Sequence, residues 1–129
     1  MDSYFYFVAI GKENAVRALG DDVQVAGSEV HAMKPNPHDP RIPDERWYWQ
    51  SPRRDCVTEF PEDELLAHMI ASPGFLGKVA AHRNAIRRFS AVIVCAAGAT
   101  GLRGISVSES LLTMLAGVRG SIEIDLLLR

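Results

Sequence analysis

The residue types best suited to holding a metal ion in this chain are His31, His38 and Asp39, which lie in or beside a proline-rich segment. Imidazole and carboxylate groups suit zinc and other transition metals. No close-spaced histidine pair and no cysteine ligand accompanies them, so polar groups on a solvated loop are the preferred interpretation. We expect neither a metal nor another cofactor, and a metal site at these three residues remains the alternative.

Groups that could act as a general base or a nucleophile are scattered along the chain. His68 and His82 fall in helical patterns, and no serine or cysteine nucleophile motif accompanies either. The carboxylates at 62–64 follow Pro61 and suit the positive end of a helix dipole, which explains them without acid–base chemistry. The turn at 99–104 (ATGLRG) lacks the lysine and the glycine spacing of a phosphate loop. An enzyme is therefore the last of three hypotheses.

Three aromatic rings lie side by side in RWYWQS, residues 46–51, with basic residues on both flanks. In a strand, Trp47 and Trp49 project to one face and Tyr48 to the other. Burial removes about 150–250 Å² of each indole from water, which stabilises the fold by several kcal/mol in total. A buried strand is the preferred interpretation. A ligand-facing aromatic platform is the alternative, and a nucleic-acid platform comes last because the cations are terminal and not interleaved.

The composition is that of an ordinary globular domain, with 129 residues, 47% of them apolar and 23% charged. The net charge of −2 gives no electrostatic footprint for nucleic acid. Cys56 and Cys95 form no close-spaced motif, so we expect a reducing compartment and a cytoplasmic protein. Two arginines precede Cys56 and could lower its pKa, but an ordinary thiol is the preferred interpretation. The N-terminal apolar run is short and has no basic start, so neither a signal peptide nor a membrane span is expected.

Apolar periodicity predicts five strands and four helices in the order β-α-β-β-αα-β-α-β. Strands are expected at 3–11, 23–33, 46–51, 89–98 and 121–129, and helices at 12–20, 58–72, 76–88 and 106–118. Consecutive strands with short links favour antiparallel pairs. We therefore predict an α+β fold, a single-domain two-layer sandwich over residues 1–129 with helices packed on one face of a mostly antiparallel sheet.

Local patterns refine this scheme. Gly20 is expected to end the first helix. Arg83, Arg87 and Arg88 are placed towards the C-terminal end of a helix, where the helix dipole explains them without a ligand. The last strand is expected to have one buried and one solvated side. The positions expected to face the core are Leu65, Leu66, Met69, Ile70, Leu111, Leu112 and Leu115 on helices, and Ile122, Ile124, Leu126 and Leu128 on the last strand.

Residues 34–46 hold four of the seven prolines, so neither a helix nor a strand ladder can run through them. We predict a long exposed loop, and such loops on small scaffolds often carry function. Its mixed charges suit a protein partner better than a nucleic acid. The candidates for partner binding extend from this loop across the aromatic strand and are His38, Asp39, Arg41, Asp44, Glu45, Arg46, Arg53 and Arg54.

Several motifs occur in an order that resembles one bacterial family. They are YFYFVAIGK near the start, ALG after the first helix, WYWQS, and the closing stretch GISVSESLLTMLAGVRGSIEIDLLL. Over nearly its whole length the chain resembles the bacterial domain-of-unknown-function family 4279. It departs from that pattern at DDVQVAG and HAMKPNP, where the family carries a Pro-Thr turn and a Lys-Gly-Asp-like step. The resemblance implies no catalytic residues, and similar proteins occur among bacterial immunity-like proteins that neutralise toxins by binding them.

These observations favour a non-enzymatic cytoplasmic protein that binds another protein, in the manner of an immunity protein. The alternative is a small-molecule or metal-binding domain, with Trp47, Trp49 or Tyr48 lining a pocket and His31 or His38 as ligands. No nucleic-acid partner and no membrane partner is expected.

Overall fold

The computed structural model describes residues 3–33, 46–97 and 105–128. Most of the predicted proline-rich loop, 34–45, therefore lies outside the described residues. The elements follow each other as β1 (Tyr4–Gly11), α1 (Glu13–Val23), β2 (Glu29–Ala32), β3 (Trp47–Gln50), β4 (Arg54–Asp55), α2 (Pro61–Ala71), α3 (Pro73–His82), β5 (Arg88–Ala97), α4 (Glu109–Gly117) and β6 (Gly120–Leu128). The predicted order is confirmed, with the short β4 added. No helix in this part of the chain is long and apolar enough to cross a membrane.

The sheet has the strand order β2-β3-β1-β5-β6, and β4 also pairs with β1. Every pair is antiparallel except β5 and β6, which run parallel. This topology brings the end of β1 together with the starts of three other strands, because Gly11 pairs with Trp47, Ile10 with Arg88, and Phe89 with Gly120. The opposite end of the sheet holds the start of β1 and all of β4.

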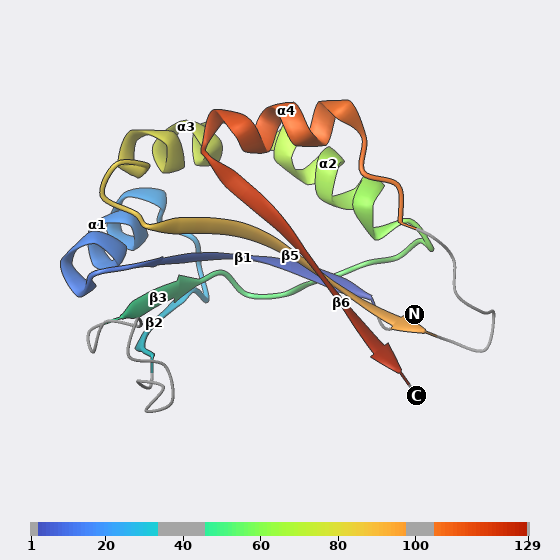
Figure 1. Cartoon of the computed structure of the whole chain (residues 1–129), viewed down its shortest axis with the longest axis horizontal. Coiled ribbons are helices and arrows are strands. Elements are labelled where there is room, and N and C mark those ends of the chain that lie inside the picture. The colour runs from blue at the N-terminus through green and yellow to red at the C-terminus, as the bar shows by residue number, and fades with distance from the viewer. Residues whose placement is uncertain (1–2, 34–45, 98–104, 129) are drawn as a thin grey trace.

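All four helices cover one face of the sheet (Figure 1). Strand β1 shows why, since its side chains alternate between buried and half-buried positions. Phe5, Phe7 and Ala9 point toward the helices and are buried. This period-two alternation matches a strand with one covered face. The predicted α+β sandwich, with helices on one face of a mostly antiparallel sheet, is confirmed.

Trp49 is the largest side chain that is fully buried, with 0% of its surface exposed. It lies under α1, where a Cβ added to Gly20 would come within 3.0 Å of the indole. The expectation that Gly20 ends the helix is wrong, because α1 continues to Val23 and ends at Gln24 in a left-handed conformation (φ 51°). Gly20 is thus required for the close approach of the helix to Trp49. The prediction that the tryptophan strand is buried holds fully for Trp49 and partly for Trp47.

Two residues of the predicted helical stripes do not face the core. Ile70 is 61% exposed and Leu112 is 54% exposed. Their buried neighbours show the reason: Leu65 and Met69 lie on the inner side of α2, and one step of about 100° past Met69 carries Ile70 off that side. Leu112 stands in the same relation to the buried Leu111 on α4.

The last strand is less buried than its pattern predicts. Ile122 packs against the core, but Ile124 is 41% exposed and Leu126 is 53% exposed. Strand β6 is at the edge of the sheet, and α4 packs over its beginning, where a Cβ on Gly120 would meet Leu115 at 3.1 Å. The rest of β6 runs away from all four helices (Figure 1). Apolar and polar side chains do alternate along β6, but no described helix covers the second half of the strand.

Candidate functional site

The end of the sheet where β1 finishes carries five arginines, which come from four segments of the chain. Arg46 precedes β3, Arg83 and Arg87 belong to the link between α3 and β5, Arg88 begins β5, and Arg119 precedes β6. The antiparallel pairing of β1 with β3 and β5, and the parallel pairing of β5 with β6, place these segments side by side. We call these five residues the arginine surface.

Two hollows open on the arginine surface and share two of its residues. The first has a volume of about 220 Å³ and its polar lining consists of Arg83, Arg87, Arg88, Arg119 and Asn84. The second has a volume of about 240 Å³ and is lined by Ile10, Arg46, Arg87 and Arg88. No described residue that lines either hollow carries a carboxylate, and apolar groups such as Phe89 and Val118 line the first.

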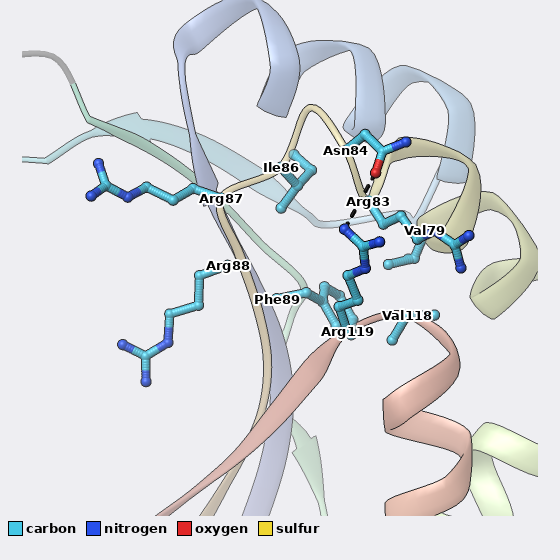
Figure 2. Close-up of a pocket in the computed structure, with 9 residues that line it drawn as sticks. All are labelled: Val79, Arg83, Asn84, Ile86, Arg87, Arg88, Phe89, Val118 and Arg119. Atoms are coloured by element: carbon cyan, nitrogen blue, oxygen red, sulfur yellow. Dashed lines mark hydrogen bonds between the residues drawn. The ribbon is translucent and has the colours of Figure 1, made fainter.

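The guanidinium groups of this surface do not converge on one point. Figure 2 shows Arg87 and Arg88 directed away from Arg83 and Arg119, with Phe89 between the two pairs. Arg119 adopts a left-handed backbone conformation (φ 54°), which is uncommon for a residue other than glycine, asparagine or aspartate. The arrangement is therefore a broad basic surface and not a single preformed anion hole.

Most of these cations have no carboxylate partner among the described residues. Arg83 donates to the carbonyl oxygen of Gly117 at 3.3 Å, and Arg119 donates to Asn84 Oδ1 at 3.4 Å, both long contacts. Arg88 forms an ion pair with Glu123.

The side chains of the remaining two arginines make fewer hydrogen bonds and ion pairs. Arg87 makes no side-chain hydrogen bond or ion pair to any described residue, and Arg46 Nε is buried without a hydrogen-bond partner. Positive charge is thus concentrated here and only partly neutralised.

The sequence patterns did not identify this surface. The predicted helix over 76–88 is wrong at its end, because α3 stops at His82. Ile86 is buried outside the helix, in the link to β5, so its apolar character imitated another helical turn. The helix dipole therefore does not explain Arg87 and Arg88.

Three of the eight predicted partner-binding residues are described, and these three do not form one cluster. His38, Asp39, Arg41, Asp44 and Glu45 lie outside the described residues. Of the other three, Arg46 belongs to the arginine surface, while Arg53 and Arg54 lie at the opposite end of β1. Arg53 lies over the ring of Tyr4 at 4.9 Å and forms an ion pair with Asp55 at 3.4 Å.

Of the three predicted metal candidates, one lies among the described residues. His31 is an exposed residue of β2 that contacts Glu29 at 2.9 Å and packs against Tyr48. His38 and Asp39 lie outside the described residues. Among residues 3–33, 46–97 and 105–128, no group of three or more potential metal ligands occurs.

The other titratable candidates are Cys56, His82 and His68, and each has a defined set of neighbours. Cys56 is buried, and burial raises the pKa of its thiol to about 11, so the two preceding arginines do not activate it. His82 contacts Asp22 at 2.9 Å. Burial, with a smaller effect of the Arg54 charge, lowers the pKa of His68 below its ordinary value.

Glu64 serves the turn before α2. Its carboxylate accepts hydrogen bonds from the backbone amides of Val57 and Thr58 and from the Thr58 hydroxyl, at 2.8–3.0 Å. Partial burial alone would raise the pKa of this carboxyl, but the three hydrogen bonds outweigh it and lower the pKa. The sequence explains the carboxylates at 62–64 by the electrostatics of the helix start. The structure adds specific hydrogen bonds from Glu64 to the preceding turn.

Comparison with known proteins gave no match to a family model, to a curated protein or to a solved structure. The resemblance to the bacterial domain-of-unknown-function family 4279 therefore stays a prediction.

Proposed function

We propose that this chain is a non-enzymatic binding protein whose arginine surface recognises a carboxylate-rich segment of another protein. The observation that carries the proposal is the concentration of arginines around two hollows, whose described lining residues include no carboxylate. Like charges held together destabilise a fold unless something compensates them. An acidic partner would supply that compensation.

The chemistry of arginine supports a carboxylate ligand. The planar guanidinium donates two parallel hydrogen bonds to a carboxylate, which a lysine cannot do. Arginine is also enriched among the residues that dominate the energy of protein interfaces. The apolar lining at Phe89 and Val118 offers the desolvated surroundings in which such pairs are strongest.

The spread of the side chains favours a segment with several carboxylates over a single small anion. Arg87 and Arg88 point away from Arg83 and Arg119 (Figure 2), so one anion cannot engage both pairs in this conformation. A peptide segment with spaced acidic residues can. A toxin that an immunity protein covers, as the family resemblance implies, would be one such partner.

The surroundings support a protein partner over nucleic acid. The chain carries a net charge of −2, and acidic residues border the arginines: Asp22 contacts His82 beside Arg83, and Glu123 pairs with Arg88. An extended phosphate backbone would meet these carboxylates on leaving the patch. A short acidic segment would not.

The test is fluorescence anisotropy with a labelled ten-residue peptide of alternating glutamate and glycine. Arg87→Gln and Arg119→Gln should each weaken binding about fivefold, the effect of losing roughly 1 kcal/mol from a partly exposed ion pair. The matched control is Arg53→Gln, which removes the same charge at the other end of β1 and should change the affinity less than twofold.

Added salt should weaken the peptide complex, because screening acts on exposed charges. Absence of peptide binding, equal losses in the Arg53 control, or tighter binding of a single-stranded oligonucleotide of equal charge would contradict the proposal.

A further inference from the structure

A third cavity lies at the other end of β1, away from the arginine surface. Its volume is about 200 Å³, and it opens between the sheet and the α2–α3 corner. We call this cavity the His68 pocket. Among the residues that line it are Phe5, Phe7, Ser51, Arg54, His68 and Phe75.

The walls of the His68 pocket are aromatic. The ring centroid of Phe7 lies 5.1 Å from that of Phe75 and 6.0 Å from that of His68, and Phe5 lies 5.6 Å from His68. Flat walls of this kind pack against a planar ligand in stacked or edge-to-face geometry. An apolar cavity of about 150 Å³ is already large enough for benzene, so about 200 Å³ admits one ring with a short substituent.

Polar groups in the pocket have hydrogen-bonding capacity to spare. Ser51 is 6% exposed, and its Oγ accepts the Phe7 amide hydrogen at 2.8 Å. The hydroxyl hydrogen of Ser51 finds no acceptor in the described part of the chain. His68 makes ring contacts there but no hydrogen bond. Ligand pockets commonly combine apolar walls with a few such groups.

Arg54 provides a cation on the face of the sheet where the His68 pocket lies. It pairs with Phe5 in the β1–β4 register, so its side chain leaves on the same face as the Phe5 ring. Arg54 and His68 line the same cavity, and the Arg54 charge contributes to the lowered pKa of His68. Arg54 forms no ion pair with any described residue, whereas the neighbouring Arg53, which also lines the cavity, pairs with Asp55 and lies over the Tyr4 ring.

We infer that the His68 pocket binds a small aromatic carboxylate, with a single ring between Phe5, Phe7 and Phe75 and the carboxylate at Arg54. The Ser51 hydroxyl and the His68 imidazole would supply further hydrogen bonds to the carboxylate or to a ring substituent. This inference is independent of the proposed function, because it uses other residues at the opposite end of β1.

The experiment is an NMR titration of the ¹⁵N-labelled protein with phenylacetate at millimolar concentrations. The amide shifts should move at residues 51, 53, 54, 68 and 75. Two matched probes separate the two halves of the ligand: 2-phenylethanol keeps the ring and loses the charge, and acetate keeps the charge and loses the ring. Phenylacetate should bind about tenfold more tightly than 2-phenylethanol, as expected for one hydrogen-bonded charge pair, and acetate should show no saturable binding.

Two variants test the assignment of the cation. Arg54→Gln should reduce the affinity for phenylacetate about tenfold and leave that for 2-phenylethanol unchanged. Arg119→Gln, which removes the same charge at the other end of β1, is the matched control and should change neither affinity by more than twofold. The inference is overturned if phenylacetate causes no saturable shifts, if its shifts fall elsewhere, if acetate binds as tightly, or if the Arg119 variant loses as much affinity as the Arg54 variant.

Discussion

The two ends of β1 present arginine in opposite settings. At the Gly11 end, five arginines from four segments line two hollows, and the four of them drawn in Figure 2 point in different directions. At the Tyr4 end, Arg53 and Arg54 line a cavity walled by Phe5, Phe7 and Phe75, and Arg53 already pairs with Asp55. The first region is dominated by charge and the second by aromatic surface.

The difference follows from where each region lies on the sheet. The arginine surface is assembled from the starts of β3, β5 and β6 and from the link between α3 and β5. The His68 pocket lies between the sheet and the α2–α3 corner, so its walls are core residues that are incompletely covered. We therefore expect binding to the arginine surface to depend strongly on salt, and binding in the pocket to depend mainly on ring burial.

The largest expected effect concerns the core that supports both regions. Trp49 is fully buried, and its ring lies 6.1 Å from that of Phe75 in the pocket wall. Trp49→Ala should lower the free energy of unfolding by about 3–5 kcal/mol, as for other large buried aromatic residues. Urea unfolding followed by circular dichroism measures this. Trp47→Ala, at the partly buried position under Arg17, should cost clearly less, and an equal cost would contradict the packing described.

A smaller effect is expected at the turn that joins β4 to α2. Glu64→Gln removes the charged acceptor of three hydrogen bonds and should destabilise the fold by about 1 kcal/mol at neutral pH. The folded-state pKa of Glu64 is lowered, so its stabilisation is complete above the unfolded-state pKa and is lost as pH falls through the folded-state pKa. Urea midpoints of the two proteins should thus converge in acid; a constant difference would contradict the role of the charge.

A still smaller effect, of opposite sign, sharpens the contrast between the two ends. Arg87 has no ion pair among the described residues and shares its hollows with four other arginines. Arg87→Gln should therefore stabilise the fold by a few tenths of a kcal/mol at low ionic strength, and the gain should vanish in high salt. Thermal unfolding at two salt concentrations tests this. A destabilised variant would show that Arg87 has a structural role.

The smallest effect is spectroscopic. Burial and the Arg54 charge lower the pKa of His68, so its imidazole is neutral at neutral pH, and its contribution to stability is lost as pH falls below the unfolded-state pKa toward the folded-state value. Arg54→Gln should raise the His68 pKa only part of the way to its ordinary value, because burial is the larger cause. An NMR titration of the imidazole measures the shift; no change would separate Arg54 from the pocket.

The sequence predicted the architecture well because periodicity reports which side of an element is buried. The alternation of Trp47, Tyr48 and Trp49 in β3 led to the correct sheet face, with Trp49 inside. The pattern could not show where the helix layer ends. Ile124 and Leu126 alternate correctly, yet they are exposed because β6 extends past α4.

The candidate sites were harder to predict because both depend on strand pairing. Arg46 and Arg88 are far apart in the sequence and meet only through the register of β1 with its two neighbours. Conversely, Arg46 and Arg54 are close in the sequence but lie at opposite ends of β1. The helical pattern correctly placed His68 on a helix, but its aromatic neighbours Phe5 and Phe7 come from β1.

The most direct test of the central claim, two separate recognition sites at the two ends of β1, is one NMR chemical-shift map recorded with both probes. The acidic peptide should shift amides at residues 83–88 and 119 only. Phenylacetate should shift those at 51, 53, 54, 68 and 75 only, and each probe should bind unchanged in the presence of the other. Overlapping sets of shifted residues, or competition between the two probes, would contradict the account.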